Sequence, residues 1–168
     1  MRKTGDKFRT IWQHPENPAI VQIIDQRKLP HEYVVTDLVT WQEGATAIQD
    51  MLVRGAPLIG ATAAWSLYLA AIDAAGNDDN KATVLAAADA LEATRPTAIN
   101  LRWALDRMRK VIEASTPDKL AETLAAESRD ICDEDVEISR GIGEHGLTLI
   151  EEIAARKKGE PVNVLTHC

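Results

Sequence analysis

The apolar run at residues 58–72 constrains the fold most, because Gly55, Ala56 and Pro57 stand directly before it. Proline suits the first position of a helix, where the N–H group that it lacks has no partner in any case. We therefore expect a helix that begins at Pro57 and continues through the apolar run. Gly55 and Ala56 have small side chains, so the approach to the start of this helix stays open.

Arg54 precedes this helix start and adds a fixed positive charge to it. The first N–H groups of a helix have no internal partner and lie at the positive end of its dipole. A phosphate can bind there, and the arginine side chain adds a forked pair of donors. The pattern predicts an anion site. The alternative is an ordinary turn between two helices in which Arg54 is merely solvated.

A second turn has the same pattern, an arginine and a proline followed by an expected helix, at Arg95 and Pro96. Thr97 can cap the helix that we expect from Ala98 to about Ala114. If the two turns converge, Arg54 and Arg95 address one phosphate. The alternative for Arg95 is a surface charge beside a kink, which would contribute little.

Elsewhere the sequence predicts a small N-terminal sheet followed by helices. β-branched residues and proline punctuation favour strands at residues 8–12, 19–25 and 33–35. Thr36 and Asp37 are expected to cap a turn or a short helix toward Trp41. Apolar spacing predicts helices at residues 46–53 and 82–93, another that starts at Ser115, and a last one at residues 133–158.

The last predicted helix contains Gly141, Gly143 and Gly146. Each glycine weakens a helix by roughly 1 kcal/mol relative to alanine, so a compensating feature is expected. The two options are close packing against another helix and a kink near His145. A lone histidine in this position is more often structural than catalytic.

Composition limits the classes of partner. The 168-residue chain carries a net charge of −7, which disfavours extended binding to nucleic acid or to an anionic membrane. Cys132 and Cys168 are too few for a disulfide framework and lack metal-ligand spacing, which favours a reducing compartment. With no secretory signal pattern at its start, we expect a cytoplasmic protein.

Residues 162–165 follow a Gly and Pro break and are typical of the first core strand of an open parallel α/β sheet. Functional groups gather beyond the carboxyl ends of such strands, and Cys168 would lie there. A single strand cannot make a sheet, so we expect this chain to be the front part of a longer protein. The alternative for Cys168 is a terminal thiol without a role.

Four segments in succession resemble the signatures of one enzyme family: IIDQRKLP at residues 23–30, VRGAPLIG at 53–60, RPTAINL at 95–101 and LTHC at 165–168. They are similar to those of S-methyl-5-thioribose-1-phosphate isomerases, and GEHG at residues 143–146 also fits. This family shares a superfamily with ribose-1,5-bisphosphate isomerases and with regulatory subunits of translation initiation factor 2B. The arginine-containing turn and Cys168 favour the isomerase branch.

The resemblance implies an α/β protein overall, of which this chain is mostly α-helical with a small N-terminal β-sheet and ends at the first strand of a Rossmann-like parallel sheet. The expected division is a β-rich segment at residues 1–40, a helical domain at 41–158, and a linker with the first Rossmann-like strand at 159–168. The rest of the Rossmann-like domain would be absent from this chain.

The resemblance further implies that Arg54, Gly55, Ala56 and Arg95 bind substrate and that Cys168 takes part in the chemistry. The reaction would be the isomerisation of 5-methylthioribose 1-phosphate to 5-methylthioribulose 1-phosphate in methionine salvage, without a cofactor or a metal. The implied partners are the C-terminal part of the same protein, joined to this chain or present as a second chain, and a second subunit in a homodimer, but no nucleic acid and no membrane. The catalytic acid would lie downstream.

Two alternatives remain open at this point. A related isomerase would act on ribose 1,5-bisphosphate or 5-deoxyribose 1-phosphate, and residues that contact the C5 substituent cannot be identified. A non-catalytic regulatory subunit of the initiation factor 2B type would turn over no sugar phosphate. Trp65, Tyr68 and Trp103 would line an apolar pocket or, more often for such residues, form helix-packing core.

Overall fold

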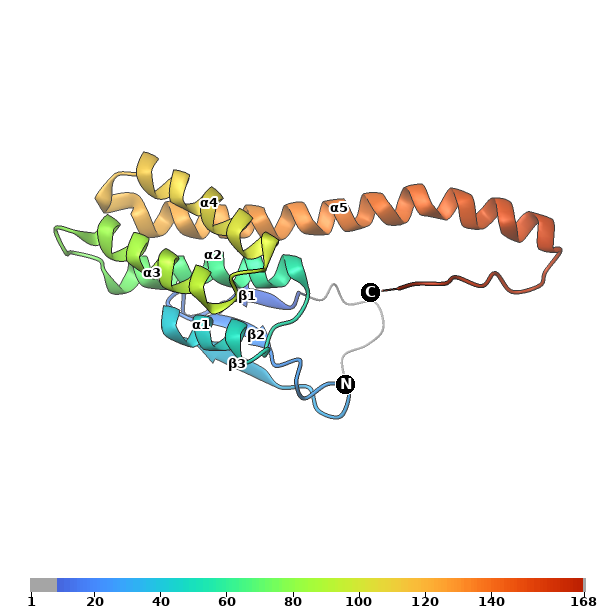
Figure 1. Ribbon diagram of the computed structural model, residues 1–168, viewed down its shortest axis with the longest axis horizontal. Coiled ribbons are helices and arrows are strands. Elements are labelled where there is room, and N and C mark those ends of the chain that lie inside the picture. Colours follow the sequence, from blue (N-terminus) through green and yellow to red (C-terminus); the bar gives the residue numbers. More distant parts are fainter. Residues whose placement is uncertain (1–8, 168) are drawn as a thin grey trace. The chain divides into compact units, whose positions relative to one another are not determined.

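The computed structural model describes residues 9–167 and divides the chain into two compact units, one up to Cys132 and one from Asp133 onward (Figure 1). The described residues contain a three-stranded sheet and five α-helices. The prediction of a mostly helical chain with a small N-terminal sheet is confirmed.

The sheet of the first unit is antiparallel, in the order β1 (Ile11–Gln13), β2 (Val21–Ile24) and β3 (Val35–Leu38). Ile11 pairs with Ile23, and Ile23 pairs with Thr36. The predicted cap at Thr36 and Asp37 was wrong, because both residues belong to β3. The β-branched run at residues 34–36 extends into this strand instead of ending before it. Phe8, predicted to begin the first strand, lies outside the described residues.

Helix α1 (Trp41–Gln49) begins earlier than predicted because Thr40 caps it. The Thr40 hydroxyl accepts from the Glu43 N–H at 3.2 Å, and the Glu43 carboxylate accepts from the Thr40 N–H at 3.0 Å. This reciprocal arrangement is a capping box.

Helix α2 (Ala56–Asp73) is the core of the unit and contacts α1, α3 (Asn80–Thr94), α4 (Ile99–Ala114) and β1. All residues from Ile59 to Ala71 are buried. By length and composition α2 could cross a membrane, but 78% of its apolar window is buried inside the chain's own core. Pro57 is the second helical residue, not the first, and its missing N–H group costs nothing there either.

The prediction that Thr97 caps α4 was wrong. The Ala98 N–H donates to the Arg95 carbonyl at 3.0 Å, which closes a turn and delays the helix until Ile99. Ala98 occupies the capping position and brings no side-chain acceptor.

A short 3-10 turn, η1 (Pro117–Lys119), leads into α5 (Leu120–Lys157), a single helix of 38 residues. The separate start predicted at Asp133 was wrong, because no glycine or proline interrupts the chain between Leu120 and Arg140. The helix also continues through Gly141, Gly143 and Gly146.

The segment after α5 differs from the prediction. Residues 161–167 form neither helix nor strand, and the Leu165 side chain is 99% exposed. A strand requires a hydrogen-bonded neighbour, and within residues 9–167 these residues have none. The three-part domain division expected from the sequence stays a prediction.

Candidate functional site

The turn between α1 and α2 is fixed from behind by backbone hydrogen bonds. The Leu52 and Val53 N–H groups both donate to the Ala47 carbonyl, at 3.0 and 3.3 Å. Met51 reverses the chain with a φ of 60°, and Val53 is fully buried. Arg54 therefore follows an anchored residue, and its backbone position is set by the core.

The loop after β2 braces the same turn. The Gln26 N–H donates to the Leu52 carbonyl at 2.8 Å, two residues before Arg54. This loop is held in turn by an ion pair between buried Asp25 and the exposed side chain of Arg27, in which Arg27 Nε and Nη2 donate to Asp25 Oδ1 and Oδ2 at 2.9 and 2.8 Å. The Arg27 N–H also donates to Asp25 Oδ1 at 3.0 Å. These bonds lower the pKa of Asp25, the Arg27 guanidinium being the largest cause.

These hydrogen bonds are what the segment at residues 23–30 contributes to the structure: they support the turn that carries Arg54. The strand pattern in the sequence predicted only that a strand ends in this segment. A buried aspartate, 4% exposed, with an arginine two residues later is a local signal that could have identified it.

Gly55 shapes the start of α2. Its φ of 96° and ψ of 130° lie in a region that residues with a Cβ atom rarely adopt. The first intrahelical bond runs from the Ile59 N–H to the Gly55 carbonyl at 3.0 Å, so the N–H groups of Ala56 and Leu58 have no partner within the helix. No side chain among the described residues caps this end. The start of α2 therefore offers open backbone donors to an anion.

Arg54 is exposed, and it makes no hydrogen bond or ion pair with any other residue in the described range 9–167. Its guanidinium group is therefore not committed to a carboxylate of any described residue. An anion bound at the start of α2 could recruit this side chain without first breaking an internal ion pair.

The starts of α2 and α4 pack against each other. A Cβ atom on Gly60 would lie 2.8 Å from the Asn100 carbonyl oxygen and 3.2 Å from the Ala104 Cβ. Gly60 is in the second turn of α2 and Asn100 in the first turn of α4, and Figure 1 shows both helices starting at the same end of the helical layer. The turns that carry Arg54 and Arg95 thus lead into neighbouring helix starts. The convergence of the two guanidinium groups on one ligand stays a prediction.

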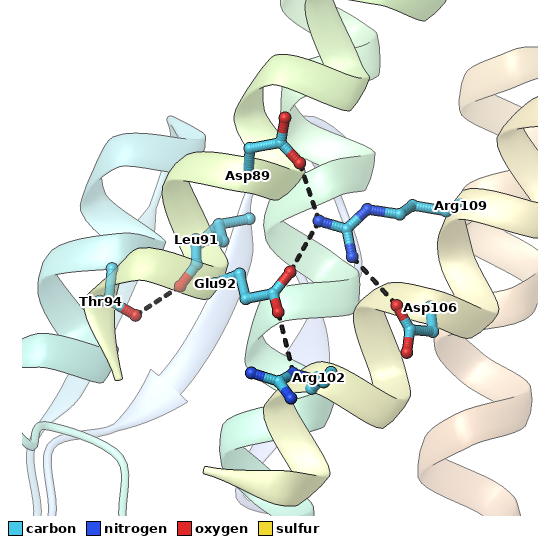
Figure 2. A network of polar contacts seen from close by, with 7 residues as sticks. All are labelled: Asp89, Leu91, Glu92, Thr94, Arg102, Asp106 and Arg109. Atoms are coloured by element: carbon cyan, nitrogen blue, oxygen red, sulfur yellow. Dashed lines mark hydrogen bonds and ion pairs between the residues drawn. The ribbon is translucent and has the colours of Figure 1, made fainter. Parts of the chain in front are cut away.

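Arg95 sits in the connection between α3 and α4, and its side chain is half-buried. A network of charges clamps the helices on either side of it (Figure 2). Glu92 accepts from Arg109 at 2.9 Å and from Arg102 at 3.0 Å, and Arg109 also donates to Asp89 at 2.9 Å. The Arg109 bond, followed by the Arg102 bond, holds the pKa of Glu92 below its ordinary value.

The three aromatic residues considered for an apolar pocket separate into two groups. Trp65 and Tyr68 are 2% and 5% exposed and pack edge to face in the core. Trp103 is 49% exposed, with the Arg107 guanidinium 5.6 Å from its ring centre. The expectation of helix-packing core thus applies to Trp65 and Tyr68 but not to Trp103.

The remaining predicted site residue, Cys168, lies outside the described residues. Within residues 9–167, no three His, Cys, Asp or Glu side chains cluster as the ligands of a metal ion would.

Comparisons with known proteins give this geometry a context. The methylthioribose-1-phosphate isomerase of Cereibacter sphaeroides is 52% identical over the whole chain, which spans 44% of that protein's length. A crystal structure of 5-methylthioribose 1-phosphate isomerase from Pyrococcus horikoshii matches 77% of the chain with a TM-score of 0.70 and 37% identity, and the match covers 37% of that structure's chain. The translation initiation factor eIF-2B subunit delta from A. fulgidus matches 85% with a TM-score of 0.77 and 33% identity, and the match covers 42% of its chain.

The chain therefore spans less than half the length of these relatives. The model of the initiation factor 2 subunit family matches residues 52–168, which include the Arg54 turn, both tightly packed helix starts and α5. This match covers well over half of the sequence. The chain belongs to the initiation factor 2 subunit family.

Proposed function

We propose that this chain supplies the phosphate-binding part of an aldose–ketose isomerase that converts 5-methylthioribose 1-phosphate to 5-methylthioribulose 1-phosphate in methionine salvage. The observation that carries the proposal is the start of α2, where uncapped backbone N–H groups lie beside Arg54, which has no partner among residues 9–167. The names of the relatives from C. sphaeroides and P. horikoshii support the choice of substrate.

In this proposal Arg54 and the backbone of Gly55 and Ala56 bind the phosphate group, and Arg95 contributes a second positive charge. A dianionic phosphate is matched by two arginines and a helix dipole in both charge and hydrogen-bond geometry. The neighbouring starts of α2 and α4 support this pairing of the two turns.

The phosphate on the anomeric oxygen sets the chemical task. The sugar ring has no free hemiacetal hydroxyl, so ring opening requires acid assistance at the ring oxygen, and hydrogen must then move between C2 and C1. We assign to Cys168 the stabilisation or protonation of groups along this path. The acidic group that acts opposite it is proposed to lie outside this chain, in the part of the protein by which the relatives are longer. We further propose a cytoplasmic homodimer that uses no cofactor.

A regulatory subunit of the initiation factor 2B type is the second candidate, because the A. fulgidus structure superimposes on more of this chain than the P. horikoshii structure does. Such a protein would bind a partner without turning over a sugar phosphate. The uncommitted arginine at the start of α2 is the observation that favours the isomerase.

The test is a turnover assay with 5-methylthioribose 1-phosphate on the protein extended to the length of its relatives, with the mass of every polypeptide measured. Arg54→Ala and Arg95→Ala are each expected to lower kcat/KM by about 10- to 150-fold, the loss for one charge-assisted hydrogen-bonding group. Lys110→Ala, which removes an exposed cation elsewhere on α4, should leave kcat/KM within about twofold. Cys168→Ser should lower kcat.

The two candidate functions give opposite results in this assay. No turnover by the extended protein with either methylthioribose 1-phosphate or ribose 1,5-bisphosphate would reject the isomerase and favour the regulatory subunit. Turnover with only the bisphosphate would retain the phosphate site and replace the substrate. Full activity in Cys168→Ser would remove that residue from the chemistry.

A further inference from the structure

Two residues of the loop after β2, Asp25 and Arg27, form an ion pair that has no role in the proposed phosphate site as described so far. The Asp25 side chain is 6% exposed and the Arg27 side chain is 42% exposed. The two parallel bonds between them fix the plane of the guanidinium group, so Arg27 is held in one place although solvent reaches it. The pair therefore gives the loop a defined shape.

Gln26 lies between the two members of this pair, and the shape of the loop decides where its N–H group points. The Arg27 N–H donates to Asp25 Oδ1 at 3.0 Å, and the Asp25 N–H donates to the Val34 carbonyl at 3.0 Å. These bonds close a tight turn around Gln26. The Gln26 N–H is thereby directed at the Leu52 carbonyl, to which it donates at 2.8 Å.

Arg27 also interacts with the end of α1, directly before the Arg54 turn. The pKa of Arg27 is raised most by its hydrogen bonds to Asp25, and the negative charge of Asp50 raises it further. Asp50 is the C-terminal cap residue of α1 and precedes Arg54 by four residues. The guanidinium group of Arg27 thus attracts this part of the chain electrostatically, in addition to the backbone bond made by Gln26.

The part of the candidate site that depends on this support is Arg54. The backbone N–H groups at the start of α2 are fixed by the helix itself, which packs on α4 through Gly60. Arg54 precedes the helix, is exposed and has no partner among residues 9–167. Its placement before an anion arrives is therefore set by the backbone of the turn, which the loop after β2 holds at Leu52.

We propose, on the basis of the proposed function, that Asp25 and Arg27 are positioning residues for its phosphate site. Their ion pair holds the loop after β2 in the shape that places Arg54 ready for the phosphate group of the ligand. Neither residue of the pair contacts the ligand in this arrangement. A side chain that is already placed loses less freedom on binding, so the pair raises the affinity for phosphate without adding a contact.

Isothermal titration calorimetry with inorganic phosphate tests this role on the protein extended to the length of its relatives. Arg27→Gln should raise the dissociation constant of phosphate about 3- to 30-fold, the range for a residue that acts through another. In turnover the same substitution should raise KM and leave kcat within about twofold, because it weakens the binding of substrate and transition state alike. Hydrogen exchange at the Gln26 amide should become faster in the variant.

Tyr68→Phe is the control for a loss of stability alone. It removes a hydroxyl that donates to the Pro18 carbonyl at 2.7 Å and accepts from Gln13 at 2.7 Å. Tyr68 is about 18 Å along α2 from the start of the helix at Ala56. This variant should lower the melting temperature, as Arg27→Gln does, and change the phosphate dissociation constant less than about twofold.

A double-mutant cycle tests whether the ion pair acts through Arg54. Arg54→Ala alone should weaken phosphate binding. Arg27→Gln added to Arg54→Ala should then change the dissociation constant less than about twofold, because the side chain that the pair positions is gone. Additive effects of the two substitutions would overturn the positioning role.

Failure of this role and failure of the proposed function give different results. If Arg54→Ala leaves phosphate affinity unchanged, there is no anion site at Arg54, and both proposals are wrong. If Arg54→Ala weakens binding but Arg27→Gln does not, the ion pair is only structural and the proposed function stands. The same conclusion follows if Tyr68→Phe weakens binding as much as Arg27→Gln does.

Discussion

The α-carbon of Gly60 faces the carbonyl oxygen of Asn100 so closely that a methyl group in place of its hydrogen would lie 2.8 Å from that oxygen. Both positions are in the first two turns of their helices, so this contact sets how near the start of α2 lies to the start of α4. Gly60→Ala should destabilise the chain by about 1–2 kcal/mol, because overpacking against a backbone atom exceeds the gain in helix propensity. Urea unfolding followed by circular dichroism measures it.

Gly141→Ala is the matched control, since it makes the same change inside a helix at a position where an added Cβ atom would meet no atom of the described residues within 4 Å. It should stabilise α5 by about 0.5–1 kcal/mol. If both variants changed the free energy of unfolding in the same direction and by the same amount, the packing of Gly60 against α4 would not contribute to stability.

Gly55→Ala should cost about 1–3 kcal/mol of stability, because its φ of 96° strains any residue with a Cβ atom. Gly76→Ala introduces the same kind of strain, at a φ of 86°, in the loop after α2. Both variants should lower the melting temperature. Only Gly55→Ala should also weaken the binding of inorganic phosphate, measured by isothermal titration calorimetry, because it alone alters the candidate anion site.

The Asp25–Arg27 ion pair should stabilise the loop that supports the Arg54 turn. Arg27→Gln leaves the buried carboxylate without its two guanidinium bonds, and we expect a loss of about 1–3 kcal/mol. In a double-mutant cycle with Asp25→Asn, the second substitution should cost much less in the Arg27→Gln background than alone. Additive losses would mean that the two side chains act independently and that the ion pair does not brace the Arg54 turn.

The elements that sequence reasoning identified correctly are those with strong local signals. The apolar run before Asp73, preceded by Gly55 and Pro57, predicted α2 to within about a residue at its start. The β-branched residues correctly predicted β2. The errors concern signals that many residues can supply. Thr36, Thr40 and Thr97 all have the chemistry of a helix cap, and tertiary structure selects Thr40 alone among them.

The contacts that hold the candidate site in place could not have been predicted from the spacing of residues in the sequence. The hydrogen bond from Gln26 to Leu52 and the contact of Gly60 with Asn100 join segments that are distant in sequence. No propensity describes such a pairing, because it depends on how the sheet and the helices pack. The turn at Arg54 and the turn at Arg95 were recognisable individually, whereas the adjacency of the helices that follow them required the structure.

The stability of the folded chain should depend on pH through Glu92. Its pKa is lowered in the folded chain, first by the hydrogen bond from Arg109 and then by that from Arg102, relative to an ordinary value of 4.5. The folded state therefore binds the proton less well than the unfolded state. The resulting stabilisation is fully present above the unfolded pKa and is lost as the pH falls through the folded pKa.

Glu92→Gln should accordingly destabilise the chain at pH 7, and its difference from the unsubstituted protein should shrink as the pH falls below about 4.5. Urea unfolding at a series of pH values between 7 and 3 measures this difference. Glu152→Gln is the control, because Glu152 is exposed and has no recorded ion pair within the described part of α5, and its effect should be small at every pH. A Glu92→Gln loss that stays constant down to pH 3 would contradict the assignment, since an uncharged hydrogen bond would then be the source of the stability that links α3 to α4.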